Sequence, residues 1–331
     1  MQSNYEKGNK IMTYETFKER LHDEIESGII ELDIDGVSIK EETIPTSSGL
    51  SDRMIVSFPG RSTVSMAFRL QESYDRCHGD EEEFRNCVSG MLRTIADTIP
   101  TLQDKQSLVT EVLSSYELAK DYLGLRLIPG DAPVLDRTPH IMYADDLALV
   151  CQIVFEGFEE DGRSSTIVCD EMLKMFGIDK ETLFRDATKT AAEKDPMTII
   201  PMSKILAKMN PDFELPETDI NNEFFVASTM SKMHGAAVLG YENFFEKASS
   251  IMPGGFFVLP SSTHELILLP HNDCIEITEL DEMIKSVNAN ELRPEEILSD
   301  HCYHYDAKEK IFESGEQYVK RISASSKQIA S

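Results

Sequence analysis

Two short apolar runs joined by a polar link impose the strongest constraint on how this chain can fold. Residues 256–259 are Phe-Phe-Val-Leu and residues 266–269 are Leu-Ile-Leu-Leu, with Gly255 before the pair and Pro270 after it. Apolar runs of this length that end at Gly or Pro predict buried strands, and the polar residues between them predict a hairpin loop. Because each run is apolar on both faces, we expect the hairpin to lie in the middle of a sheet.

The N-terminal part of the chain combines helices with a small sheet. Residues 14–25 place apolar side chains at helical spacing, with Thr13 as the expected cap and Gly28 as the expected end. Three runs rich in β-branched residues, separated by turn residues, predict an antiparallel meander. These runs span residues 37–44, 54–58 and 63–70. Acidic residues at 80–83 then predict the start of a helix, since negative charge suits the first turn.

Further strands and helices are mixed along the rest of the chain without regular alternation. The expected strands, besides the central hairpin, span residues 105–112, 145–158, 165–169, 224–230, 236–239, 302–305 and 311–313. The expected helices span residues 117–122, 170–176, 180–193, 202–209, 241–250 and 279–288. This irregular order predicts an α+β fold with a mixed or antiparallel sheet.

Composition changes suggest a division of the chain into a smaller N-terminal and a larger C-terminal part. We expect a disordered tail over residues 1–13 and an N-terminal α+β part over residues 14–128. A Pro-rich bend then leads into a C-terminal α+β part with the larger sheet over residues 129–318. The Ser-rich residues 319–331 predict a flexible tail. Met12 is an alternative start to Met1, because the first patterned residues follow it.

The charge of the chain restricts its partners. The formal net charge is −27, from 59 acidic and 32 basic residues. Such a surface repels nucleic-acid phosphates and anionic membranes, which bind proteins through Lys and Arg. We therefore expect no direct nucleic-acid binding and no membrane binding, and a basic protein as the partner. Mimicry of nucleic-acid charge, which would inhibit a DNA-binding protein, is an alternative.

The lack of a recognisable targeting signal and the pattern of cysteines predict a cytoplasmic protein. No apolar run reaches the roughly 20 residues that a membrane helix needs, and the N-terminus lacks the apolar core of a signal peptide. The six cysteines form no Cys-x-x-Cys pair, so we expect reduced thiols. No Gly-rich phosphate-binding motif occurs, and we expect no cofactor.

The link of the central hairpin contains the candidate catalytic residues Ser261, Ser262, His264 and Glu265. A serine activated by histidine and oriented by a carboxylate is the arrangement of a nucleophilic hydrolase. Against this, no Gly-x-Ser-x-Gly elbow occurs, and working triads usually gather residues from distant segments. The simpler interpretation is that the hydroxyl groups satisfy loop backbone groups and that His264 hydrogen-bonds locally.

Two other clusters suggest metals. Cys302 and His304 would share one face of a strand, which makes them weak candidates for zinc ligands. A structural zinc site needs four ligands, and the remaining cysteines lack the spacing, so we expect no metal. The sequence Tyr-Ala-Asp-Asp at residues 143–146 is similar to the metal-binding motif of reverse transcriptases. The net charge opposes a template channel, and an ordinary strand start is the preferred interpretation.

Cys77 and Cys87 lie near the acidic helix, where a catalytic thiolate would need a histidine from elsewhere.

Several short motifs are spread over most of the chain. They are Leu125-Arg126-Leu127, Pro139-His140, Asp146-Leu147-Ala148, Gly235-Ala236-Ala237, Leu259-Pro260-Ser261-Ser262 with His264-Glu265, and Pro294 to Asp300. Together they resemble a bacterial family catalogued as domain of unknown function family fifty-six eighty-eight. The resemblance extends from about residue 14 to residue 312. It implies a soluble cytoplasmic α+β protein and carries over no catalytic residue.

From the residues alone, the leading hypothesis is a non-enzymatic acidic binding protein of the cytoplasm. Its motivation is the net charge together with the lack of a complete catalytic or cofactor motif. A hydrolase-like enzyme that uses the loop at 261–265 is the alternative. The sequence leaves the oligomeric state open.

Overall fold

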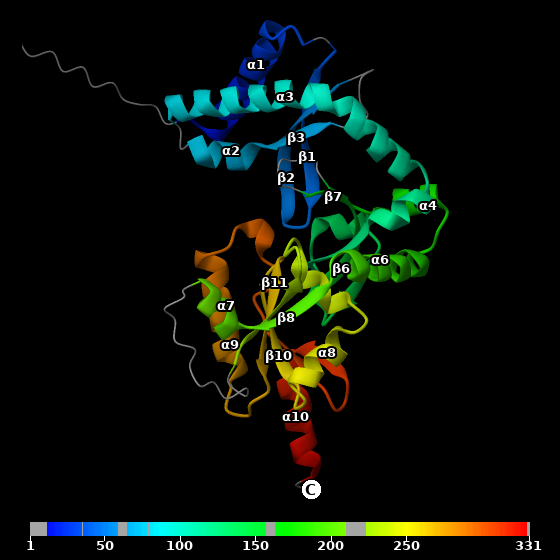
Figure 1. The fold of residues 1–331 in the computed structure, drawn as a ribbon. Helices are drawn as coiled ribbons and strands as arrows, with labels where there is room; N and C mark the ends of the chain where they lie inside the picture. Colours follow the sequence, from blue (N-terminus) through cyan, green and yellow to red (C-terminus); the bar gives the residue numbers. More distant parts are fainter. Residues whose placement is uncertain are drawn as a thin grey trace, which may run out of the picture. The chain divides into compact units, whose positions relative to one another are not determined.

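The computed structural model describes residues 12–34, 36–58, 65–77, 80–156, 163–209 and 223–329. Two compact units divide the chain (Figure 1). The smaller comprises Met1–Thr46 and Leu50–Ser114, and the larger comprises Ser47–Gly49 and Ser115–Ser331. Strand β4 (Leu123–Pro129) therefore belongs to the larger unit, whereas the sequence placed most of it in the N-terminal part. The α+β class is confirmed, and the sheets are antiparallel.

In its described residues, the smaller unit packs three helices against a three-stranded sheet. The sheet order is β1-β2-β3, which confirms the predicted meander. Its elements are α1 (Tyr14–Glu31), β1 (Ser38–Thr46), β2 (Gly49–Ser57), β3 (Met66–Arg69), α2 (Leu70–Cys77) and α3 (Glu81–Ser114). The Thr13 side chain caps α1 as expected, by accepting a hydrogen bond from the Thr16 backbone N–H. A single apolar core, which includes Phe17, Met54 and Phe84, joins the helices to the sheet.

Two predictions for this unit were wrong. Helix α1 passes through Gly28, where a Cβ atom would lie 2.3 Å from a methyl carbon of Leu92. Glycine here allows α1 and α3 to approach closely instead of ending the helix. The strand predicted at 105–112 lies within α3. The apolar residues Leu108, Val109 and Val112 fit helical spacing as well, and short apolar runs do not separate the two structures.

The described strands of the larger unit form two sheets. The four-stranded sheet has the order β4-β6-β5. Strand β5 pairs with residues 147–150 of β6, and β7 pairs with residues 152–156 of the same strand. Its strands besides β4 are β5 (His140–Tyr143), β6 (Leu147–Glu156) and β7 (Arg163–Ile167). The associated helices are α4 (Tyr116–Ala119), η1 (Lys120–Tyr122), η2 (Pro133–Arg137), α5 (Asp170–Phe176) and α6 (Lys180–Lys194). The long buried strand predicted near residues 145–158 is confirmed as β6, with α6 packed against β4.

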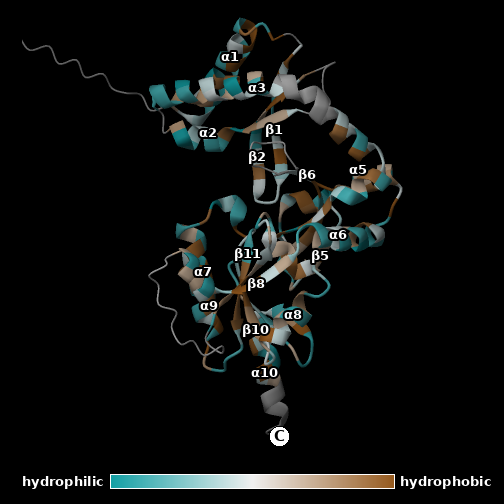
Figure 2. Ribbon diagram, viewed as in Figure 1, coloured by the Kyte–Doolittle hydropathy of each residue, from teal (hydrophilic) through white to brown (hydrophobic). Residues whose placement is uncertain are grey.

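The six-stranded sheet contains the hairpin that organises the sequence. Its order is β13-β12-β10-β11-β9-β8, so the hairpin β10–β11 occupies the centre as predicted. The strands are β8 (Met197–Pro201), β9 (Phe225–Thr229), β10 (Phe256–Ser262), β11 (Glu265–Pro270), β12 (Tyr303–Asp306) and β13 (Ile311–Ser314). The helices are α7 (Met202–Met209), η4 (Gly235–Gly240), α8 (Phe244–Ile251), α9 (Ile277–Asn290), η5 (Pro294–Glu296) and α10 (Gly315–Ile329). Figure 2 shows apolar colours along β10 and polar colours on helices such as α6.

Two segments of this unit differ from prediction. Residues 236–239, predicted as a strand, form most of the buried 3₁₀ helix η4. Gly235 begins this helix in such close contact with β9 that the chain turns there instead of extending. Residues 319–329, predicted as part of a flexible tail, continue helix α10, and residues 330–331 lie outside the described part. Of the predicted N-terminal tail, residues 1–11 also lie outside it. Within the described ranges, no helix has both the length and the apolarity needed to cross a membrane.

Candidate functional site

The tip of the central hairpin is held between two other loops of the larger unit. Ser262 ends β10 and pairs with Glu265, the first residue of β11. The Thr263 backbone N–H donates to the Glu296 carbonyl at 2.9 Å, and the Thr263 carbonyl accepts from the Ala236 N–H at 3.2 Å. The candidate residues are thus fixed by the segments that contain η4 and η5. These loops are distant from the hairpin in sequence.

The Ser262 hydroxyl is used by the loop backbone. Its Oγ atom accepts a hydrogen bond of 3.0 Å from the backbone N–H of His264, and the residue is buried. Such a turn is the local arrangement that serine favours in loops. The structure thus brings Ser262 to the backbone of His264 and not to its imidazole. Ser261 and Glu265 are half-buried in the same hairpin.

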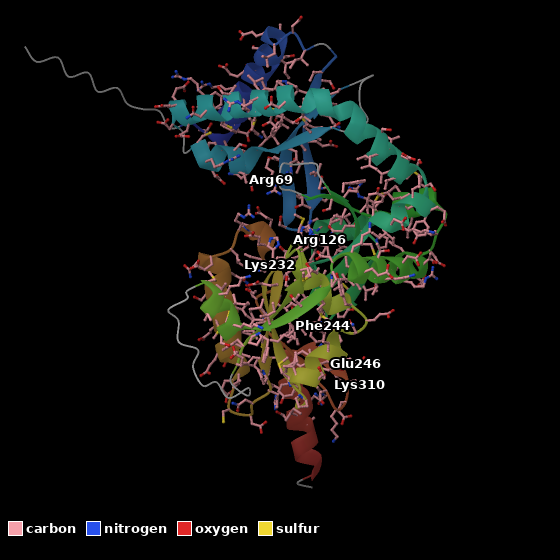
Figure 3. All side chains as sticks on the ribbon, viewed as in Figure 1. Arg69, Arg126, Lys232, Phe244, Glu246 and Lys310 are labelled. Carbon is pink, nitrogen blue, oxygen red and sulfur yellow. The ribbon has the colours of Figure 1, made fainter. Side chains whose placement is uncertain are left out.

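The His264 imidazole lies among backbone groups and one carboxylate. Its Nδ1 atom is 3.2 Å from the Lys232 carbonyl and 3.4 Å from the His234 N–H. Its Nε2 atom is 3.6 Å from a carboxylate oxygen of Glu296. Lys232, which Figure 3 labels, and His234 both have positive φ angles, of 62° and 52°. Side chains with a Cβ rarely adopt such angles, so the contacts of this loop hold a strained backbone.

Glu296 remains ionised beside His264. A hydrogen bond from the Arg293 side chain is the main cause that lowers the pKa of Glu296, and the nearby His264 lowers it further. The Arg293 guanidinium lies 2.7 Å from the carboxylate oxygen that faces His264. The Nε2 atom of His264 thus faces a carboxylate that Arg293 holds in place.

His234 forms the inner layer of the cluster. Its ring is stacked on that of His264 with 6.1 Å between centroids. Gln152 donates from Nε2 to the Leu125 carbonyl at 3.1 Å and approaches the His234 Nδ1 atom at 3.3 Å. Burial, with Arg126 and His264 nearby, lowers the pKa of His234 to about 3. His234 is therefore neutral at neutral pH, and its Nδ1 accepts from Gln152.

Glycine is required where this loop enters η4. A Cβ atom on Gly235 would lie 2.1 Å from the Ser228 Oγ atom and 2.4 Å from the His264 carbonyl oxygen. Ser228 in turn donates to that carbonyl at 2.7 Å. Sequence analysis selected Gly235 and Glu296 only as part of the family resemblance and gave neither a role beside His264. His234 was missed, because its spatial proximity to His264 leaves no local sequence pattern.

Chemically, this cluster offers an imidazole, a carboxylate and an arginine. The Ser–His hydrogen bond that nucleophilic catalysis requires does not occur within the cluster, where the Ser262 hydroxyl is occupied by backbone. The catalytic assignment of Ser261, Ser262, His264 and Glu265 stays a prediction.

The two weak metal candidates lie next to the β10–β12 pairing. Cys302 is buried, and burial raises the pKa of its thiol above the usual range. His304 is buried too, with Nε2 at 3.2 Å from Nδ1 of His271 and its ring 3.9 Å from that of Tyr318 between centroids. Across the part of the chain that the structure describes, no group of three or more His, Cys, Asp or Glu side chains is placed to hold a metal ion. The zinc hypothesis for Cys302 and His304 gains no further ligand there and stays a prediction.

Residues 143–146 form the turn between β5 and β6. Ala144 and Asp145 have positive φ angles, and the turn is tied to the C-terminal elements by its carboxylates. Asp146 accepts hydrogen bonds from the Tyr303 hydroxyl at 2.7 Å and the Ser299 hydroxyl at 2.9 Å, whereas Asp145 accepts from the Gln317 amide at 2.9 Å. Both carboxylates thus join segments of the larger unit.

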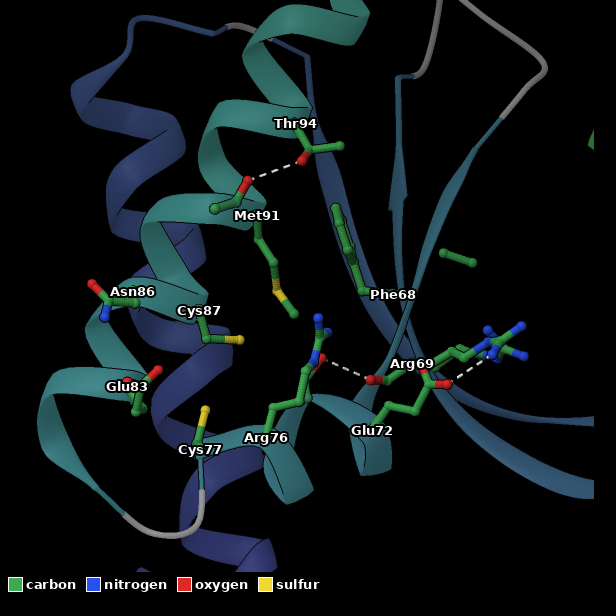
Figure 4. A pocket seen from close by; sticks show the side chains of 14 residues that line it. Phe68, Arg69, Glu72, Arg76, Cys77, Glu83, Asn86, Cys87, Met91 and Thr94 are labelled. Carbon is green, nitrogen blue, oxygen red and sulfur yellow. Dashed lines mark hydrogen bonds and ion pairs between the residues drawn. The ribbon is translucent and has the colours of Figure 1, made fainter. Parts of the chain in front are cut away.

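The smaller unit contains a cavity that sequence analysis did not predict. Its volume is about 670 Å³, and it lies between β2, β3, α2 and α3 (Figure 4). Three arginines, Arg53, Arg69 and Arg76, contribute to its lining. Cys77 and Cys87 also line it, and their position near the acidic helix was the one available signal in the sequence.

Comparison with known proteins identifies one related family. A family model described as "Family of unknown function (DUF5688)" matches residues 14–307, which is most of the chain. No curated protein and no solved structure matches the chain.

Proposed function

The chain belongs to the family of unknown function DUF5688, and since that description assigns no activity, we propose a function from the residues themselves: a non-enzymatic binding protein that contacts a basic protein through acidic faces. The observation that carries this proposal is a row of exposed carboxylates on helix α1.

The row follows one face of α1. Glu15, Glu19, Asp23 and Glu26 are all exposed, while the opposite face of the helix is buried in the core of the smaller unit. The first three are spaced four residues apart, so they lie about 6 Å apart along the helix axis and nearly in line. Glu26 falls on the same face, three residues further on.

This row opposes helix stability. Like charges four residues apart cost a helix about 0.2–0.5 kcal/mol per pair. Lys18 lies 3.1 Å from the Glu15 carboxylate and offsets the charge at one end. Among the described residues, Glu19, Asp23 and Glu26 have no ion-pair partner. A row that costs stability and stays open to solvent supports a role in binding.

The charge of the whole chain strengthens the same proposal. A net charge of −27 attracts a basic partner over several ångströms and speeds its encounter, in a manner that salt screens. All six cysteines are free thiols, which supports the cytoplasm as the setting.

The test is a pulldown in which the bait protein and the salt concentration are both varied. The wild-type chain and the triple variant Glu19→Gln, Asp23→Asn, Glu26→Gln serve as baits in lysate at about 50 mM and about 300 mM salt. We expect basic proteins to be recovered at low salt by the wild type, less at high salt, and less by the triple variant.

A matched control separates the α1 row from total charge. The variant Glu276→Gln, Glu279→Gln, Glu282→Gln removes the same charge from exposed positions at the start of α9 in the larger unit. It should recover the same proteins as the wild type. Equal recovery by all three baits, or recovery that does not depend on salt, would contradict the proposal.

Charge mimicry of nucleic acid is a narrower form of the same proposal. The regular spacing of carboxylates along α1 favours it, because a mimic needs negative charges in a row. If the recovered proteins are displaced from the wild-type bait by duplex DNA, mimicry is supported, and if DNA has no effect, an ordinary protein interface is supported.

A further inference from the structure

A cavity in the smaller unit has the size of a ligand site. Its volume of about 670 Å³ lies within the range of about 300–1,000 Å³ that small-molecule pockets occupy. Its walls come from strands β2 and β3 and from helices α2 and α3 (Figure 4). All four elements belong to the same compact unit.

The charge of the lining is opposite to that of the chain. The lining includes three arginines, Arg53, Arg69 and Arg76, and two glutamates, Glu72 and Glu83. Arg69 is paired with Glu72 at 2.8 Å. A net positive lining is unexpected in a chain with 59 acidic and 32 basic residues.

The polar groups of this lining differ in whether the protein already uses them. The Ser73 hydroxyl donates to the Arg69 carbonyl and the Thr94 hydroxyl donates to the Gly90 carbonyl, so neither is open to a ligand. Arg76 and Asn86 have no hydrogen-bond partner among the described residues. Their guanidinium and amide groups are suited to the oxygen atoms of a carboxylate or phosphate.

The remaining wall is uncharged. Phe68 and Met91 provide apolar surface, and the thiols of Cys77 and Cys87 lie close to each other beside them (Figure 4). Burial is the main cause that raises the pKa of Cys77 to about 12, with Cys87 contributing. The Cys77 thiol is therefore neutral at neutral pH and adds no charge that would repel an anion.

We propose that this cavity binds a small organic anion, with its carboxylate or phosphate group at Arg76 and Asn86 and its apolar body against Phe68 and Met91. The ligand class follows from the pairing of a guanidinium with apolar wall in one concave site. The site is separate from the acidic row on α1, and it goes beyond the proposed function.

The probe for this site is 8-anilinonaphthalene-1-sulfonate, an aromatic anion whose fluorescence rises in apolar surroundings. We expect saturable binding to the full chain and about tenfold weaker binding to the variant Arg76→Gln, the loss that corresponds to one charge-assisted hydrogen bond. The control is Arg85→Gln, because Arg85 lies on α3 outside the lining and is exposed. It should leave the affinity unchanged.

A second variant blocks the cavity without removing charge. Gly90 lines the cavity, and a Cβ atom there would meet nothing within 4 Å. Gly90→Leu should therefore preserve the fold, which circular dichroism verifies, and weaken probe binding at least as much as Arg76→Gln. Unchanged binding to both variants would overturn the proposal.

Competitors define which part of the ligand is recognised. Octanoate and octyl phosphate should both displace the probe. The one that displaces it at the lower concentration shows whether the site prefers a carboxylate or a phosphate group. Equal displacement by uncharged octanol would overturn anion recognition. The triple α1 variant should bind the probe as the wild type does, so this test can fail or succeed independently of the proposed protein partner.

Discussion

Single polar groups in the larger unit form hydrogen bonds that their sequence context does not reveal. Asp146 lies in a motif that resembles a catalytic one, yet its two carboxylate oxygens accept hydrogen bonds from Tyr303 and Ser299. Ser262 lies beside a histidine, yet its hydroxyl accepts from the loop backbone. Short motifs specify residue types, whereas chemistry depends on what each atom contacts.

His304 is a residue whose titration should be visible in stability. It is 2% exposed, and its Nδ1 atom has no hydrogen-bond partner among the described residues. Burial is the main cause that lowers the pKa of His304 to about 3, and His271 contributes. In the unfolded chain a histidine has a pKa of about 6.5. Below that pH the unfolded state binds a proton at His304 that the folded state does not bind. The contribution of His304 to folding stability is therefore fully present above pH 6.5 and is lost progressively as the pH falls toward 3.

We predict that His304→Gln reduces this pH dependence. Between pH 6.5 and pH 5 most carboxylates stay ionised, and a histidine that cannot be protonated in the fold costs about 2 kcal/mol of stability at pH 5. Urea unfolding at pH 7 and pH 5 should show a smaller difference for the variant than for the wild type. His301→Gln, at an exposed position, is the control and should keep the wild-type difference. An equal difference in all three proteins would contradict the assignment.

At the scale of helices and strands, the sequence predicts elements that carry a strong local pattern. The central hairpin β10–β11 was predicted correctly in both strands and in its place in the sheet, because its apolar runs leave few alternatives. Predictions failed where tertiary contacts decide. Gly28 looked like a helix end, and the close approach of Leu92 explains why it lies inside α1. The partners of the His264 loop, His234 and Glu296, are joined to it only by tertiary folding.

Close packing at the start of η4 gives a prediction at this scale. Gly235→Ala places a Cβ atom 2.1 Å from the Ser228 Oγ atom, so Ser228 or the backbone must move. Overpacking of this kind costs about 1–3 kcal/mol. Thermal unfolding should therefore begin at lower temperature in the variant.

The matched control for this change is Gly254→Ala in the turn before β10. A Cβ atom there would meet nothing within 4 Å, and no left-handed φ angle constrains it. We expect a stability equal to the wild type or about 0.4–1 kcal/mol higher, since alanine restricts the unfolded chain. A similar loss in both variants would show that the contact at Gly235 is not the cause.

At the scale of the whole molecule, charge is the dominant property that the sequence already specifies. A net charge of −27 repels itself in any compact state, and this repulsion extends over distances that salt screens. Many ion pairs, such as Arg20–Glu81, lie at the surface, where a pair contributes only about 0–1 kcal/mol. The stability lost when salt screens these ion pairs should therefore be smaller than the stability gained when salt screens the repulsion.

We accordingly predict that salt stabilises the folded chain. The unfolding temperature should rise between about 20 mM and about 500 mM sodium chloride, as the Debye length falls from about 20 Å to about 4 Å. The triple variant Glu19→Gln, Asp23→Asn, Glu26→Gln removes part of the repulsion along α1, so it should start from a higher unfolding temperature at low salt and gain less from added salt. Added sucrose, which stabilises proteins without screening charge, should raise the unfolding temperature of both proteins equally. A wild-type unfolding temperature that falls with salt would mean that the surface ion pairs outweigh the repulsion. The acidic faces would then be held in place by internal pairing and less open to a basic partner.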